Sequence, residues 1–261
     1  IAFDAASFGT RGYEFNGALG GAQGGDGTPL FYRRYPSWSL LGKIVHDGLA
    51  AVDLARTSWP GAWHSNGPGA DPPIGLPGLD GSKVFVVGYD IGGRAALYMG
   101  AADRPENRIK GIVSINGWTP MRNDTNASST GGIRRLWDWH ALQPALGWYD
   151  GKEEQLPFDM EDVMIEASGS GNSSTAILIY QQEFDRENDY KGVEASVAKA
   201  KDAGAKVDLL SEPTVNMLND AAHTAVIAWL KGQAELDANT SGDAIASVGP
   251  FEELCSDTEQ A

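Results

Sequence analysis

The sequence contains one cysteine, few bases and no long apolar run, and each shortage excludes a class of protein. Cys255 is the only cysteine in 261 residues, which excludes an internal disulfide framework and a zinc site built on cysteines. Lys and Arg number 20 against 35 Asp and Glu, so the formal net charge is -15. This charge repels phosphate backbones, and nucleic acid is therefore not an expected partner. Because no stretch of 18 apolar residues is present, we expect no membrane insertion.

The sequence does contain enough apolar material for a core, since 42% of its residues are hydrophobic. A chain of this length and composition is expected to fold as a globular domain. Four polar stretches carry Asn-x-Ser/Thr sequons, at Asn123, Asn126, Asn172 and Asn239. These sequons predict glycosylated surface loops and a secreted or cell-surface protein. Chance matches in loops rich in Ser and Asn are the alternative interpretation.

Short apolar runs alternate with helical patterns along most of the chain. Strands are expected at 83–87, 109–115, 175–180 and 206–210. The first of these runs, KVFVV, has the composition of a strand that is buried on both faces of a sheet. Helices are expected from Ser37 or Ser39 to Arg56, and at 88–101, 189–203 and 220–231. This alternation predicts a parallel α/β sheet with helices on both faces.

Four segments interrupt the pattern. Sequences rich in glycine and proline at 17–27 and 60–81 are expected to be surface insertions. Residues 117–172 are rich in Trp and Gly, and they are too many for a simple crossover between strands. They predict a small helical cap over the carboxyl edge of the sheet. Residues 232–261 hold seven acids and no base, so we expect a flexible acidic tail after a domain of residues 1–231.

The sequence GYDIGG at 88–93 connects an expected strand to an expected helix. This is the context of a nucleophile elbow, where a sharp turn lifts the middle side chain above the sheet. That side chain is Asp90, at the position where the pattern G-x-S-x-G has Ser. A phosphate-binding loop is the alternative, but a carboxylate at its centre would oppose an anion at the helix N-terminus. No spacing indicates a metal site and no second glycine-rich motif indicates a nucleotide, so no cofactor is expected.

The chain resembles an α/β-hydrolase family that is grouped with dienelactone hydrolases and acetyl xylan esterases. The resemblance covers residues 1–231 and is carried by FDAASFGTRG, YPSWSLLGKIVHDGLAAVD, VFVVGYDIGG, INGWTPMRNDT, GGIRRLWDWHALQPALG and LPFDMEDV. It implies an α/β-hydrolase fold and hydrolysis of an ester or lactone, with a small ester or carbohydrate ester as substrate. The family uses a Ser-His-Asp triad in which His deprotonates Ser, Asp orients His and backbone N–H groups hold the oxyanion.

The resemblance implies three site positions, and this chain departs from the family at two of them. Asp90 replaces the nucleophilic Ser. Asp185, on the loop after the strand at 176–180, matches the place of the triad acid, although other acids lie nearby, at Glu183, Glu187 and Asp189. In the family, the catalytic His precedes an aromatic-Leu pair that closes the last helix. Counting back from that pair, here Trp229-Leu230, the position of the base holds Asn216.

His223 is the nearest histidine and the candidate base. It lies inside the expected helix at 220–231, where apolar residues follow at helical spacing, at Val226, Ile227 and Leu230. A histidine packed in the core or in an interface is therefore the alternative. The other histidines are poorer candidates because they lie in mid-helix, in the second insertion and in the cap, at His46, His64 and His140 respectively.

The resemblance also places Ile1–Asp4 at the fourth strand of the family's sheet. The first three strands, and the oxyanion loop after the third, then have no counterpart in this sequence. The third strand normally lies between the fourth and the fifth, so its absence would leave backbone groups unpaired in mid-sheet. We expect a longer chain, or a partner protein that supplies the missing strands.

The cap segment carries aromatic and basic side chains whose role has two interpretations. Its aromatic residues and histidine either line a ligand pocket or pack within the cap: Trp118, Trp137, Trp139, His140, Trp148 and Tyr149. Arg134 and Arg135 either clamp a substrate carboxylate or pair with acids of the chain.

Three hypotheses for function follow from these residues. The first is an ester hydrolase, from the resemblance and Asp185. The second is an Asp-nucleophile hydrolase of the dehalogenase or epoxide hydrolase type, in which the Asp90 carboxylate attacks an alkyl carbon. The third is a catalytically silent structural or interaction subunit, since two triad positions hold Asp90 and Asn216.

Overall fold

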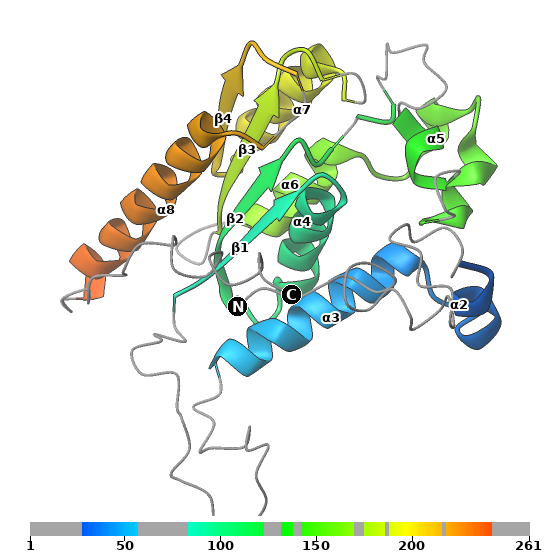
Figure 1. Cartoon of the computed structure of the whole chain (residues 1–261), viewed down its shortest axis with the longest axis horizontal. Coiled ribbons are helices and arrows are strands. Elements are labelled where there is room, and N and C mark those ends of the chain that lie inside the picture. The colour runs from blue at the N-terminus through cyan, green and yellow to red at the C-terminus, as the bar shows by residue number, and fades with distance from the viewer. Residues whose placement is uncertain are drawn as a thin grey trace, which may run out of the picture.

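The computed structural model describes residues 28–56, 83–118, 120–122, 132–137, 142–169, 175–185, 188–215 and 218–241. Within these ranges one parallel sheet is formed by β1 (Val84–Tyr89), β2 (Ile109–Ile115), β3 (Ala176–Gln182) and β4 (Val207–Glu212). The strands lie side by side in chain order, as Figure 1 shows. The predicted parallel α/β sheet is confirmed, and all four strands begin within one or two residues of their expected starts.

The two central strands are buried, whereas β1 is not. Almost every residue of β2 and β3 is buried. β1 has no buried residue, and Val87 and Tyr89 are 48% and 38% exposed. β1 is an outer strand of the described sheet, where it pairs only with β2. The prediction that KVFVV is buried on both faces is therefore wrong, because an apolar run alone does not tell a central strand from an outer one.

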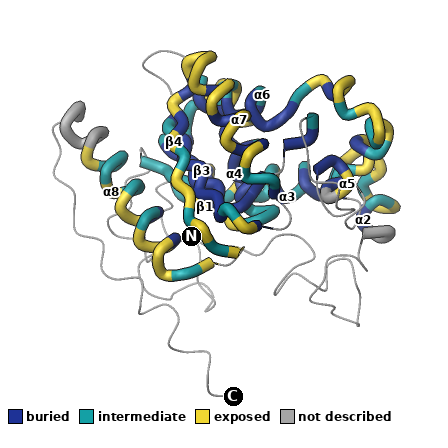
Figure 2. The backbone as a smooth tube through the Cα atoms, turned by 90° about the horizontal axis from the view of Figure 1, so that it is seen from above, coloured by how far each residue is buried: buried dark blue, intermediate teal, exposed yellow. Residues whose placement is uncertain are grey.

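Helices cover both faces of the sheet. The larger hydrophobic core lies on the face covered by α4 (Ile91–Asp103), α6 (Met160–Ser168) and α7 (Tyr190–Asp202), with α3 (Leu40–Arg56) packed against α4. On the other face, Ala222 and Val226 of α8 (Asp220–Ser241) pack against Val113 and Leu178 of the central strands. Figure 2 shows buried backbone concentrated at the centre of the sheet and in α4, with α8 largely exposed on its outer side.

The start of α3 confirms that Ser39 is the N-cap residue of this helix. The hydroxyl of Ser39 accepts a hydrogen bond from the backbone N–H of Gly42 over 2.9 Å, which satisfies one of the unpaired donors at the helix start. The preceding helix α2 (Thr28–Arg34) contributes Phe31 to a small buried cluster with Leu40 and Leu142. Ile91, the residue after Asp90, packs against this cluster, so α2 and the start of α3 form one wall beside the elbow.

The segment predicted as a cap, 117–172, contains a helix that covers the sheet. Its helical pieces are α5 (Gly132–Trp137) and two short 3₁₀ helices, η3 (Pro144–Tyr149) and η4 (Glu153–Gln155), followed by α6. The helix α6 lies between α4 and α7 and covers the face of the sheet, so it is the crossover helix from β2 to β3. The remaining pieces, α5 and η3, pack together at one end of the molecule. Local sequence pattern did not predict this crossover, because α6 begins far along the chain from the end of β2.

The last helix is longer than predicted, and it ends at Ser241 rather than at residue 231. The first part of the proposed tail is therefore helical. Residues 242–261, Ile1–Asp4 and the two insertions at 17–27 and 60–81 lie outside the described residues. Among the helices that the structure describes, none is both long enough and apolar enough to span a bilayer.

Candidate active site

Asp90 lies at the turn between β1 and α4 in a strained conformation. Its φ is 54° and its ψ is -123°, a combination that residues with a side chain rarely adopt. The backbone N–H of Asp90 donates to the carbonyl of Ile115 at the end of β2 over 2.9 Å. A residue held in such a region is characteristic of active sites, where the surrounding structure enforces the strain. The local geometry is therefore that of a nucleophile elbow.

Three glycines make this turn sterically possible. A Cβ on Gly88 would lie 2.0 Å from the carbonyl oxygen of Gly92. A Cβ on Gly93 would lie 2.9 Å from the Cα of Gly117, and one on Gly117 would lie 2.6 Å from the carbonyl carbon of Gly93. The turn and the loop after β2 thus touch backbone to backbone. Gly92 differs, because a Cβ there would meet open space.

Asp90 occupies the N-cap position of α4, but its side chain makes no capping hydrogen bond. The residue is half-buried. The elbow therefore presents a carboxylate, rather than a hydroxyl, at the carboxyl edge of the sheet.

Asp185 follows β3 at the same edge of the sheet, as the sequence predicts, and it is 9% exposed. Its Oδ2 accepts a hydrogen bond from Nδ2 of Asn188 over 2.5 Å and another from Nε2 of Gln181 over 3.3 Å. Nδ2 of Asn188 also donates to the backbone carbonyl of Asn116, over 2.9 Å. Amide groups therefore bind the carboxylate that would orient the histidine of a triad.

Asn116 joins the ends of β2 and β3. It is fully buried, and its φ is 48°. Its Nδ2 donates to Oε1 of Gln182 over 2.8 Å, and its Oδ1 accepts from the backbone N–H of Gln182 over 2.9 Å. Because Asn116 follows Ile115, these bonds also hold the carbonyl that binds Asp90. Sequence analysis missed this residue, although a polar residue directly after an apolar strand is a signal that could have found it.

The same network continues to β4 through Glu212. Its Oε2 accepts from the hydroxyl of Tyr180 over 2.8 Å and from Nδ2 of Asn219 over 3.0 Å. Burial and the bond to Glu212 raise the pKa of Tyr180 to about 12. The bonds from Asn219 and Tyr180 lower the pKa of Glu212 below its usual value. The oxygen Oδ1 of Asn219 accepts from the N–H of Ala222, so this network also fixes the start of α8.

His223 lies in the first turn of α8 and is exposed. Its backbone N–H donates to the carbonyl of Asn219, and its imidazole has no hydrogen bond with any residue that the structure describes. The neighbour Ala222, not His223, faces the sheet. The alternative of a core histidine is therefore wrong. The structure shows no contact that joins His223 to Asp90 or Asp185.

The other candidate positions are only partly described. His46 lies on α3, where its exposed ring contacts Trp38. His64, His140, Glu187 and Asn216 lie outside the described residues. Among the residues that are described, no group of three or more His, Cys, Asp and Glu side chains could hold a metal ion.

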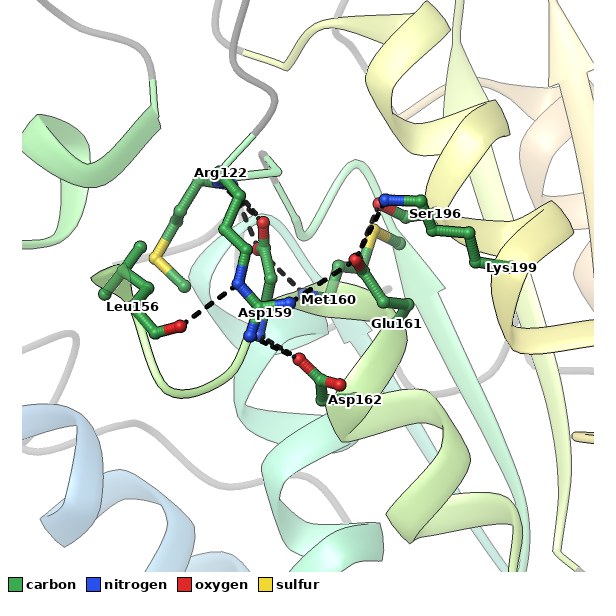
Figure 3. Close-up of polar contacts among 9 residues, drawn as sticks. Arg122, Leu156, Asp159, Met160, Glu161, Asp162, Ser196 and Lys199 are labelled. Atoms are coloured by element: carbon green, nitrogen blue, oxygen red, sulfur yellow. Dashed lines mark hydrogen bonds and ion pairs between the residues drawn. The ribbon is translucent and has the colours of Figure 1, made fainter. Parts of the chain in front are cut away.

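A buried carboxylate fixes the loop that follows β2. Asp159 is fully buried and caps α6, and its oxygens accept from the backbone N–H groups of Met121, Arg122 and Met160 over 2.7 to 3.0 Å. The guanidinium of Arg122 bonds Asp162 over 2.8 Å (Figure 3). Because Gly117, in the same loop, contacts Gly93, this clamp fixes one side of the elbow. The Asp159-x-x-Asp162 spacing is a capping-box signal that sequence analysis did not use.

The aromatic residues of the predicted cap do not share one role. Trp118 is buried, and its ring lies 4.0 Å from the guanidinium carbon of the buried Arg94 on α4. Trp148 is 77% exposed. Arg134 pairs with Asp150 over 2.9 Å, as the structural interpretation predicts. Trp139 and His140 lie outside the described residues, and the side chains of Arg135 and Trp137 are not described either.

A hollow of about 400 Å³ opens beside Asp185. It is lined by the loop after β3 and the first turn of α7, at Glu183, Phe184, Asp185, Asn188, Asp189, Tyr190 and Lys191. The volume lies in the range of small-molecule sites. Phe184 is 60% exposed at this place, so an apolar group could contact its ring.

Comparisons with solved structures identify the fold. The chain is similar to a glucuronoyl esterase from Solibacter usitatus, with a TM-score of 0.55 and 16% identity over 75% of this chain. It is also similar to dipeptidyl peptidase 4 from Porphyromonas gingivalis, with a TM-score of 0.50 and 11% identity over 78% of this chain. A putative dienelactone hydrolase from Klebsiella pneumoniae matches with a TM-score of 0.46 and 12% identity over 79% of this chain.

The first two of these matches, together with the elbow, show that the chain has an α/β-hydrolase fold, as the resemblance implies. At such low identity they carry the fold alone. The chain spans 49% of the glucuronoyl esterase, 24% of the peptidase and 66% of the dienelactone hydrolase. No protein-family model and no curated protein sequence matches it.

Proposed function

We propose that this chain is an ester-hydrolase-like protein that is catalytically silent toward esters and acts by binding. The observation that carries the proposal is Asp90 on the elbow, in the strained conformation that a nucleophile takes. In the resembling family that place belongs to Ser. The α/β-hydrolase fold is present, and this chain has a carboxylate where the resembling family has its attacking hydroxyl.

A carboxylate at this place cannot replace Ser in acyl transfer. Attack of the Asp90 carboxylate on an ester carbonyl would form a mixed anhydride, which is more reactive than the ester and is not favoured over it. The hydrogen bonds from Asn188 and Gln181 to Asp185, and the exposed position of His223, support the same conclusion. A catalytic triad needs a base within hydrogen-bond reach of the nucleophile and an acid that orients the base.

Steady-state hydrolysis of acetyl and p-nitrophenyl esters tests the proposal. We expect the wild-type protein and Asp90→Ala both to hydrolyse these esters only at the rate of the buffer alone. Asp90→Ser is the matched variant, because it restores the family's nucleophile on the same turn. We expect it to be inactive as well, because the candidate base His223 is exposed on α8 and its imidazole has no hydrogen bond with any described residue. Activity of the wild type that is lost in Asp90→Ala would overturn the proposal.

The second candidate function is hydrolysis at an alkyl carbon, and the strained φ of Asp90 favours it because strain persists where a residue reacts. One carboxylate oxygen would attack the carbon and displace the leaving group. Water would then attack the carbonyl of the resulting ester, so the alcohol leaves with an oxygen of Asp90 and the carboxylate keeps one from water. A single turnover of an alkyl halide or epoxide in heavy-oxygen water distinguishes the two functions. Label in Asp90 supports the second function, and an unlabelled Asp90 excludes it.

A binding role is compatible with two kinds of ligand. A small ester or carbohydrate ester is the partner that the resemblance suggests, and the hollow beside Asp185 is large enough to receive part of one. A protein partner in an assembly is the other. Calorimetric titration with a methyl-ester or acetylated saccharide distinguishes them, because only the first predicts saturable binding that Phe184→Ala weakens.

We further propose that the protein is secreted or displayed at the cell surface and glycosylated. The proposal rests on the sequons at Asn123, Asn126, Asn172 and Asn239. Asn239 belongs to the last turn of α8, and the other three lie outside the described residues. Intact mass before and after enzymatic deglycosylation tests it. An unchanged mass in protein from a secretory eukaryotic host would contradict it.

A further inference from the structure

We draw no further inference here: the strongest candidate, the exposed apolar patch that Val87 and Tyr89 form on β1 at the outer side of the described sheet, carries none because nothing in the structure shows what covers it.

Discussion

The side-chain amide of Asn188 donates to the carboxylate of Asp185 over 2.5 Å, at the place where a hydrolase triad would have its acid. Both residues are buried, and Asn188 also binds the carbonyl of Asn116. Asn188 thus joins the loop after β3 to the end of β2, and the carboxylate of Asp185 holds its amide in place. Asp185 therefore has a structural role in this chain.

This role predicts a loss of stability when Asp185 is replaced. Asp185→Ala leaves the buried amides of Asn188 and Gln181 without this acceptor, and we expect the free energy of unfolding to fall by about 2 kcal/mol. Urea denaturation measures the change. Glu194→Ala is the control, because it also removes one acid but lies exposed on α7, and it should change the free energy by less than about 0.5 kcal/mol. Equal values for the two variants would show that the bond to Asn188 contributes nothing.

The elbow predicts opposite tolerances for two neighbouring glycines. A Cβ on Gly88 would collide with the backbone of Gly92, so Gly88→Ala should lower the free energy of unfolding by about 3 kcal/mol. A Cβ on Gly92 meets nothing within 4 Å, and Gly92→Ala should change it by less than about 1 kcal/mol. Thermal unfolding of both variants measures the contrast. A stable Gly88→Ala protein would contradict the backbone contact described here.

The buried clamp predicts that Asp159 is among the most sensitive acids of the chain. Asp159→Ala removes the acceptor of three backbone N–H groups and the cap of α6, which should cost about 3 kcal/mol. Asp150→Ala is the matched control, because its pair with Arg134 is exposed and worth less than about 1 kcal/mol. Chemical denaturation compares the two. A loss of unfolding free energy in Asp150→Ala as large as that in Asp159→Ala would contradict this prediction.

These contacts show which features a sequence can predict. The apolar strands and the capped helix α3 follow from short-range pattern, and both were predicted closely. The exposure of Val87, the crossover helix α6 and the length of α8 depend on which segments lie beside them, and local pattern does not contain that information. At the site, the resemblance correctly placed Asp185 on the loop after β3. Its bond to Asn188 and the role of Asn116, which is 72 residues from Asn188 in sequence, depend on tertiary contacts.

The network around Glu212 predicts two changes of stability with pH. The pKa of Glu212 is lowered in the fold, so its contribution is present above the ordinary value near 4.5 and is lost as the pH falls through the folded pKa. The pKa of Tyr180 is raised to about 12 from 10.0, so its contribution is present below pH 10 and is lost as the pH rises toward 12.

Two variants separate these contributions. The stability difference between wild type and Glu212→Gln should shrink as the pH falls below 4.5, and that between wild type and Tyr180→Phe should shrink between pH 10 and 12. Urea midpoints across both pH ranges measure these differences. Differences that stay constant with pH would mean that neither group titrates differently in the folded and unfolded protein.

The most direct test of the central claim is the ratio of kcat/KM for an acetyl ester between the wild-type protein and Asp90→Ala. A silent elbow predicts a ratio of 1, with both proteins at the rate of the buffer. A working nucleophile contributes a factor on the order of 10³ or more, so a ratio of that size would contradict the account. Both proteins must show the same thermal unfolding temperature, so that the comparison reports on the carboxylate of Asp90 alone.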